Sequence, residues 1–581
     1  MDRTTSIIGT LPISLSDDRD DDDDDEGEMA MMTTAGGERR SNSVASRRHP
    51  FVIPAALVVF VALGILGAAG ARAAGSAPPQ AVADVEKTGV WPTATPESQG
   101  LDSGVLADML EHVRAGELPL HSVLIIRRGR LVLDATLYPF EPDRLHDIAS
   151  ATKSVTSLLV GIALDKGSLT SVHQRVSEVL PREASAASAN PDPRRERLTI
   201  EHLLTMTSGW HCGVEPGERE LAAMRKSVDW AAFALALPMW AEPGSKYAYC
   251  SVNNHVLSAI ISARTGQNAL AFARAHLFEP LDIKKSAWPA DPKGRTHGWV
   301  DLQLRPHDFA KLGYLYLNGG RWNGKRGVSE DWIRQSITPH VTIRDGVGYG
   351  YSWWINTTRK PAVYEMVGRG GQRVAVLPDK DLVVAFNSGG VNTDDLAPFL
   401  FRAIKSDTPL PENAEQTARL RQRLAEARQP PPQASSSATN AKPLPEIART
   451  ISGARYVIAE ANPLNLGHVS MAFSARNATE AHATFQLFDG EFTVPVGLDG
   501  RPRLSSTGPS GHPIAAKGEW ISPREFVLDL DTIANINHFV IRMQFADGQG
   551  GQGSQGGQVQ LRIDEKTGEL KDLPLSGRRS R

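Results

Sequence analysis

The chain has 581 residues, and its composition is that of a globular protein, with 41% hydrophobic and 22% charged residues. Domains of roughly 100–200 residues are usual, so this length predicts two to four structural units. The formal net charge is −3, so no basic excess points to nucleic acid as a partner. With only two cysteines, Cys212 and Cys250, the chain is neither a disulfide-rich scaffold nor a cysteine-based zinc module. The two could form one bridge in an oxidising compartment or remain separate buried thiols.

The first 90 residues differ in character from the rest of the chain. Residues 1–50 hold the acidic run Asp20–Asp25, followed by a group of arginines. Blocks of like charge repel one another and bury little apolar surface, so we expect this tail to be disordered. Residues 72–90 are predicted to be a linker.

Residues 51–71 form the longest apolar stretch and contain no charged residue. About 20 such residues span a bilayer, and the arginines before them predict a cytoplasmic N-terminus and an exported remainder. Ala71-Arg72-Ala73 offers a small-x-small cleavage site, so both a cleaved signal and a retained transmembrane anchor remain open. Either one predicts a protein of the cell envelope, periplasmic or otherwise extracytoplasmic.

Residues 91–410 are predicted to form one large mixed domain of helices and strands. Apolar residues recur at helical spacing over 105–113 and again after Ser150. The stretches 122–126 and 131–137 flank Arg128-Gly129-Arg130 and predict a hairpin. The later elements expected in this domain are a helix over 309–317 capped by Asp308, and strands over 373–377 and 382–387.

The remainder of the chain is predicted to be a connector and a second domain. Residues 411–447 comprise a charged helix over 412–428 and a linker rich in Pro, Ser and Ala. Over 448–575, apolar and polar residues alternate with period two between glycine-containing turns, which predicts a small all-β domain. The Gly- and Gln-rich stretch 547–558 is expected to be a mobile loop within it.

The motif that indicates a catalytic function is Ser150-Ala-Thr-Lys153, at the start of a predicted helix. Ser-x-x-Lys places the hydroxyl and the amine one turn apart on one helix face. A serine hydroxyl needs a neighbouring base to act as a nucleophile, and a lysine can serve if burial lowers its pKa. The alternative is an ordinary N-cap serine with a lysine on the surface.

Several further stretches accompany this motif in the order and at the spacing of one known family. They are LTIEHLLTMTSGW (198–210), PGSKYAYCSVN (243–253), GYLYLNGGRWNG (313–324), YGYSWW (349–354) and VGRGGQ (367–372). Together they resemble the serine β-lactamase-related family, and within it the class C enzymes, their esterase relatives and the 6-aminohexanoate-dimer hydrolase group. The resemblance covers about residues 95–405. The domain after residue 447 resembles β domains appended to some members.

The resemblance implies an α+β fold of the β-lactamase and penicillin-binding-protein type. In this fold an antiparallel sheet is flanked by helices and joined by an all-α subdomain, with the site between them; here a C-terminal all-β domain would follow. Ser150 would be acylated, Lys153 would share its proton, and Tyr249 would act as general base or proton relay.

The chain departs from the family's pattern in the second motif, Tyr-x-Asn. Ser251 stands at its third position, which weakens the case for true β-lactamase activity, whereas the 6-aminohexanoate-dimer hydrolase group tolerates Tyr-x-Ser. Asn253 could reach the same space.

In the third motif, Arg369-Gly370-Gly371 stands where the family has Lys-Thr-Gly or a variant of it. The two glycines would allow the backbone to approach substrate closely. The amides of Ser150 and Gln372 would form the oxyanion hole. Arg369 could hold a substrate carboxylate through two hydrogen bonds, or it could simply face solvent at the start of a strand.

These observations predict a serine hydrolase that cleaves an amide or ester bond of a small molecule or short peptide, with no metal or cofactor. A true β-lactamase or a D-amino-acid peptidase ranks second. Two alternative hypotheses remain: a catalytically silent envelope binding protein, and a protein in which the β domain performs the main function.

The aromatic residues Trp210, Tyr351, Trp353 and Trp354 are expected in the core rather than lining a pocket. Oligomeric state stays open.

Overall fold

The computed structural model describes residues 91–580, apart from 187–190, 215–217, 323, 431–442, 475–478, 488–489, 509–510, 547–556 and 568–569. The predicted tail, apolar segment and first linker therefore lie outside the described residues, as do most of the Pro/Ser/Ala linker and of the Gly/Gln-rich loop. Within the described ranges, no helix combines the length and apolar character that a membrane span requires.

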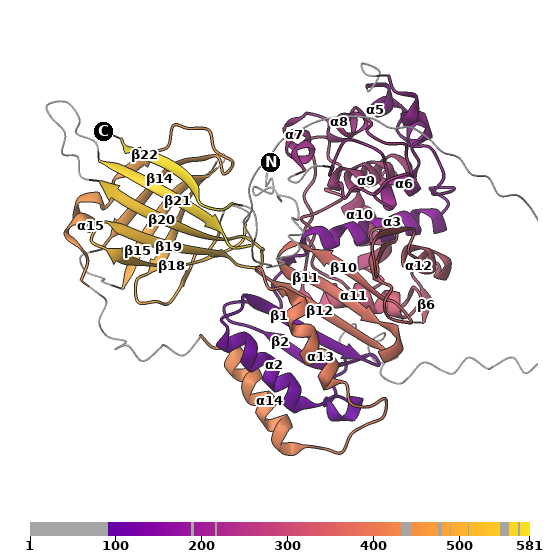
Figure 1. Ribbon diagram of the computed structural model, residues 1–581, viewed down its shortest axis with the longest axis horizontal. Coiled ribbons are helices and arrows are strands. Elements are labelled where there is room, and N and C mark those ends of the chain that lie inside the picture. Colours follow the sequence, from indigo (N-terminus) through magenta and orange to yellow (C-terminus); the bar gives the residue numbers. More distant parts are fainter. Residues whose placement is uncertain are drawn as a thin grey trace, which may run out of the picture. The chain divides into compact units, whose positions relative to one another are not determined.

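An eight-stranded antiparallel sheet forms the centre of the mixed domain (Figure 1), in the order β2-β1-β12-β11-β10-β9-β8-β7. The predicted hairpin and the two predicted late strands are all present in it. Its strands are β1 (Leu120–Arg127), β2 (Arg130–Thr136), β7 (Val341–Arg344), β8 (Val347–Tyr349), β9 (Trp354–Asn356), β10 (Val363–Gly368), β11 (Gln372–Leu377) and β12 (Leu382–Ser388).

Both faces of this sheet are covered, which is why its central strands are apolar at nearly every position. Val374 and Val376 of β11 belong to one buried cluster, whereas Ala375 and Leu377 belong to another. This alternation follows from the period of two in a strand. The sheet thus separates two hydrophobic cores.

Three helices cover one face, and Figure 1 shows them together beside β1 and β2. They are α2 (Ser103–Ala115), α13 (Ala397–Ala403) and α14 (Ala414–Ala427). The charged helix predicted over 412–428 is α14, and its Leu420 is buried in the same core as α2. It is therefore part of the mixed domain and not only a connector.

The other face carries α3 (Thr152–Asp165) and α11 (Pro306–Leu317), together with an all-helical region. The other α-helices in the described part of the mixed domain are α4 (Val176–Val179), α5 (Pro181–Ala186), α6 (Ile200–Leu204), α7 (Arg219–Lys226), α8 (Trp230–Leu235), α9 (Ser251–Thr265), α10 (Ala269–Ala273) and α12 (Glu330–Ser336). Every residue of α3 from Thr152 to Ala163 is buried, because other elements surround this helix.

The prediction that Asp308 caps a helix is wrong. The helix α11 begins at Pro306, since proline is favoured at the first helical position. Asp308 lies inside the first turn, where its carboxylate is 2.9 Å from Lys311 Nζ and 2.7 Å from Arg305 Nε. It is a buried ion-pair partner and not a cap.

The β domain is a ten-stranded sheet that closes on itself, because β16 pairs with β18 as well as with its neighbour β15. Its interior is one apolar core, as the alternating pattern predicts. A short helix, α15 (Glu446–Ile451), precedes it. The strands are β13 (Arg455–Val457), β14 (Leu466–Phe473), β15 (Glu480–Leu487), β16 (Gly490–Gly497), β17 (Arg503–Leu504), β18 (Ile514–Ser522), β19 (Glu525–Thr532), β20 (His538–Ala546), β21 (Gln558–Glu565) and β22 (Leu573–Arg579).

Candidate active site

Ser150 lies in a single 3-10 turn, Ala149–Ala151, which leads directly into α3. Lys153 follows one turn later, and its Nζ donates a hydrogen bond of 2.9 Å to Ser150 Oγ. Lys153 is only 1% exposed, while Ser150 is 9% exposed. The alternative of a surface lysine beside an N-cap serine is therefore wrong, and the hydroxyl and amine are paired as the motif predicts.

Burial lowers the pKa of Lys153 to about 8, while the negative charge of Glu218 opposes this shift. The Nζ also donates a hydrogen bond of 3.3 Å to the carbonyl of Trp299. An ordinary lysine is almost entirely charged at neutral pH. This lysine instead has a substantial neutral fraction near neutral pH, and a neutral amine is able to accept a proton from Ser150.

Tyr249 precedes α9, and the centre of its ring lies 4.8 Å from Lys153 Nζ. Burial raises the pKa of Tyr249 above its ordinary value, although a hydrogen bond with Ser150 opposes the shift. The phenol is therefore protonated at neutral pH. A protonated phenol beside both Ser150 and Lys153 suits a proton relay better than a base that starts ionised.

A carboxylate that the motifs did not reveal holds Ser251. Glu218, the residue before α7, is buried and accepts hydrogen bonds from the Ser251 amide and, at 2.9 Å, from its hydroxyl. Burial raises the pKa of Glu218, and Lys153 opposes that shift. The Ser251 hydroxyl is therefore occupied by a protein partner. Asn253 does not replace it, because its Nδ2 lies 3.3 Å from Met206 Sδ inside the core.

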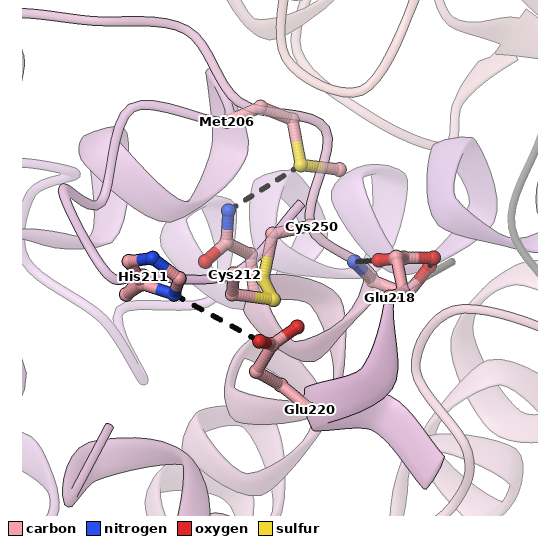
Figure 2. The surroundings of a disulfide bond; sticks show 8 residues. Met206, His211, Cys212, Glu218, Glu220 and Cys250 are labelled. Atoms are coloured by element: carbon pink, nitrogen blue, oxygen red, sulfur yellow. Dashed lines mark hydrogen bonds and ion pairs between the residues drawn. A yellow bond between two sulfur atoms is a disulfide. The ribbon is translucent and has the colours of Figure 1, made fainter. Parts of the chain in front are cut away.

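Cys212 and Cys250 form a disulfide, which decides between the two alternatives for these residues (Figure 2). The bond ties the loop after Trp210 to the residue between Tyr249 and Ser251, and Glu218 lies beside it. Among the described residues, Cys212, Glu218 and Cys250 are the one group close enough to hold a metal ion. Because both sulfurs are bonded to each other, neither is a thiolate ligand.

The end of β10 passes directly against the turn that carries Ser150. A Cβ on Gly368 would lie 2.5 Å from the carbonyl oxygen of Ile148 and 3.1 Å from the amide of Ala151, so only glycine fits. Gly368 pairs with Gln372 across β10 and β11. The backbone of Gln372 is thereby brought to the end of the sheet that faces the Ser150 turn, as the expected oxyanion hole requires.

Gly370 and Gly371 adopt positive φ values of 75° and 82°, so their turn favours glycine. Protein atoms already fill the space beside them. A Cβ on Gly371 would lie 2.3 Å from Ser388 Oγ, and one on Gly370 would lie 3.1 Å from Ile536 of the β domain. The glycines thus permit close packing of the protein on itself at these positions.

Arg369 does not face solvent, and the alternative of a solvent-facing strand residue is wrong. The residue is 8% exposed, and its guanidinium contacts the carboxylate of Glu565 and the side chain of Asn537. Both partners belong to the β domain. A substrate carboxylate would have to compete with Glu565 for this group.

Comparison with known proteins decides the family. A family model described as Beta-lactamase matches residues 106–408, which is more than half of the chain. The chain belongs to the beta-lactamase family. Its mixed domain has the fold of β-lactamases and penicillin-binding proteins, and the β domain is an addition to it.

Individual relatives of this beta-lactamase family member are distant. A 6-aminohexanoate-dimer hydrolase from Paenarthrobacter ureafaciens is 24% identical over 317 residues, covering 50% of this chain and 78% of the relative. The match to the octameric penicillin-binding protein homologue from Pyrococcus abyssi covers 81% of this chain and 99% of that protein, at 17% identity and with a TM-score of 0.40. The match to a penicillin-binding protein from Bacillus halodurans covers 50% of this chain and 99% of that protein, at 19% identity and with a TM-score of 0.42.

The prediction that four aromatic residues lie in the core is confirmed for three of them and is wrong for Trp354. Trp210, Tyr351 and Trp353 are each buried in the core. Trp354 is partly exposed, and its ring centre lies 5.9 Å from that of Tyr249. It therefore supports the side chain of Tyr249 at the edge of the site.

Proposed function

We propose that this protein is a serine hydrolase that cleaves an amide or ester bond through an acyl-enzyme on Ser150. The observation that carries the proposal is the hydrogen bond between Ser150 Oγ and the buried amine of Lys153, whose pKa is lowered to about 8. The family consists of serine hydrolases with this fold, which supports the same conclusion.

In the first step, Ser150 Oγ attacks the carbonyl carbon while its proton passes to the neutral amine of Lys153. The electron pair of the carbonyl moves to its oxygen, and the amides of Ser150 and Gln372 stabilise that negative charge. When the intermediate collapses, the leaving group takes a proton from Tyr249. The phenol then recovers a proton from the Lys153 ammonium.

In the second step, water attacks the acyl carbon and gives its proton to Lys153. Ser150 Oγ then leaves and takes that proton from the Lys153 ammonium, which restores the starting state. Each proton that leaves a group is returned within the cycle, so the three side chains suffice for both steps.

Neutral amide or ester substrates rank above β-lactams and peptides that end in D-amino acids. In this chain Ser251 stands at the third place of the second motif and is hydrogen-bonded to Glu218. A relative of this chain is named 6-aminohexanoate-dimer hydrolase, which supports an amide hydrolase. We place the activity in the cell envelope, because residues 51–71 predict export and the disulfide suits an oxidising compartment.

The proposal is tested by the steady-state hydrolysis of p-nitrophenyl butyrate and of a short anilide. We expect turnover by the full-length protein and a loss of at least about a thousandfold in Ser150→Ala, since a nucleophile is removed outright. Ser177→Ala, a serine elsewhere in the same domain, is the control and should keep full activity. Equal rates in the Ser150→Ala variant would exclude an acyl-enzyme on this residue.

A further inference from the structure

The β domain supplies a buried segment beside the Ser150 turn. Residues 533–537 connect β19 to β20, and we call them the 533–537 segment. Their side chains are buried, with Ile533, Ala534 and Ile536 each 1% exposed. A connection between two strands would normally lie on the surface. Here it is covered by the mixed domain, with which the β domain forms one compact unit.

Two hydrogen bonds join this segment to Asp147, three residues before the nucleophile. The Asp147 amide donates to the carbonyl of Ala534 at 2.9 Å, and Asn535 Nδ2 donates to Asp147 Oδ2 at 3.2 Å. The other carboxylate oxygen accepts from the amide of Ala149 at 2.8 Å. Asp147 therefore links the β domain to the backbone of the turn that presents Ser150.

A second connection runs through Arg369. Its Nη1 lies 3.1 and 3.2 Å from the two carboxylate oxygens of Glu565, and its Nη2 donates to Asn537 Oδ1 at 3.1 Å. Glu565 is 3% exposed and ends β21. The guanidinium is close enough to Asp147 to lower the pKa of that carboxyl, against the larger effect of burial, which raises it.

The charge of Arg369 is therefore balanced inside the protein. A substrate carboxylate that bound Arg369 would have to displace Glu565 and leave that carboxylate buried without a partner, which is unfavourable. An uncharged substrate group meets no such obstacle. Penicillin-type β-lactams and peptides with a free C-terminus carry a carboxylate near the scissile bond, whereas simple esters and amides do not.

We propose that the β domain is part of the active site, and that Glu565 holds Arg369 so that the enzyme selects substrates with no carboxylate near the scissile carbonyl. This inference rests on the proposed hydrolase function and names the substrate class of the same site. The 533–537 segment and Glu565 act as specificity determinants, because they shape and neutralise the region beyond Gly370.

The test uses the full-length protein in mild detergent with two pairs of esters. The first pair is p-nitrophenyl butyrate and the mono-p-nitrophenyl ester of succinic acid, which differ by a carboxylate on the acyl side. The second pair is phenyl butyrate and the butyrate ester of 3-hydroxybenzoic acid, which differ on the leaving-group side. One of the pairs reports on Arg369 whichever side of the substrate it faces.

We expect the wild type to prefer the uncharged ester in both pairs. Glu565→Gln should raise kcat/KM for the anionic member of one pair by roughly tenfold relative to its neutral partner, because a charged hydrogen bond becomes available. Glu491→Gln removes a carboxylate of the same domain that is 57% exposed, and it should leave both ratios unchanged.

A second variant distinguishes the effect of an unpaired Arg369 from misfolding of Glu565→Gln. The double variant Arg369→Gln/Glu565→Gln removes both buried charges, which proteins tolerate better than one unpaired charge, and it should restore the wild-type ratio. Unchanged ratios in folded Glu565→Gln, or a wild type that prefers the anionic esters, would overturn the inference while the hydrolase function stands. If the wild type hydrolyses none of the four esters and forms no adduct on Ser150, the proposed function falls, and the inference falls with it.

Discussion

The protonation state of Lys153 determines the pH range in which this site can work. Burial lowers its pKa to about 8, and the amine must be neutral to accept the Ser150 proton. We predict that kcat/KM for p-nitrophenyl butyrate rises with pH and levels off above about pH 8, since this parameter reports ionisations of the free enzyme. A rate that is independent of pH between about 6 and 9 would contradict a role for Lys153 as the base.

Glu218 provides a second prediction at the scale of one residue. Its negative charge raises the pKa of Lys153 against the larger effect of burial. Glu218→Gln removes the charge and can keep a hydrogen bond to Ser251, so we expect the rising limb of the pH profile to move to lower pH. Glu220→Gln, two residues away and paired with His211, is the matched control (Figure 2). An unmoved limb in Glu218→Gln would show that this charge does not act on Lys153.

The sequence predicted the side chains that meet at Ser150 but not what surrounds them. Ser150 and Lys153 are one helical turn apart, so a local motif specifies their contact. Glu218 lies 33 residues from Ser251, and no local pattern connects the two. Arg369 was expected to face either substrate or solvent, because its partner Glu565 is 196 residues away in another domain.

At the scale of elements, the disulfide joins the loop after Trp210 to the start of α9. The two cysteines are 38 residues apart, and closing a loop of that length contributes about 4 kcal/mol to stability in the chain-entropy account. Cys250 is also the neighbour of Tyr249. We predict that the double variant Cys212→Ser/Cys250→Ser loses stability of this order and also loses activity, as measured by urea unfolding and ester hydrolysis.

Reduction of the wild type with a thiol supplies the control for that variant, because it opens the same bond without changing a side chain. Both treatments should reduce kcat more than they alter KM, since a displaced Tyr249 affects proton transfer rather than binding. If the reduced protein remains folded and keeps full activity, the disulfide has no part in positioning Tyr249.

The secondary structure was largely predictable because alternating and helical periods are local properties. The strands β11 and β12 follow from short continuous apolar runs on both sides of a four-residue turn. The cap assigned to Asp308 was wrong, since the proline two residues earlier already starts the helix. The packing of α14 on α2 could not be predicted, because it depends on contacts between residues more than 300 positions apart.

At the scale of the whole molecule, two buried histidines lie where the mixed domain and the β domain meet. Burial, with a smaller contribution from the charge of His512, lowers the pKa of His146 to about 3. Burial lowers the pKa of His512 itself to about 4. Each folded pKa is below the unfolded value of about 6.5, so the unfolded chain binds more protons. Their contribution is complete above about pH 6.5 and is lost as the pH falls towards 4.

We predict that His512→Gln flattens this loss. Between about pH 6.5 and 4.5, its stability relative to the wild type should improve by roughly 1 kcal/mol per pH unit, measured by urea unfolding. The buried carboxyl of Asp147 has a raised pKa and acts in the opposite direction, so the difference between the two proteins is the informative quantity. His482→Gln, at an exposed position on β15, is the control and should follow the wild type at every pH.

The organisation into two domains was predicted from composition and alternation, whereas their shared surface was not. The contacts of Asp147 with residues 534 and 535 join segments that are almost 400 positions apart. Such contacts depend on shape and on single hydrogen bonds, which leave no periodic signal in the sequence.

The central claim is that Ser150 becomes covalently acylated, and intact-mass spectrometry after treatment with a fluorophosphonate tests it most directly. We predict one adduct per chain, located on the peptide that contains Ser150 and lost in Ser150→Ala. An adduct on a different serine, or no adduct on the folded protein, would contradict this account.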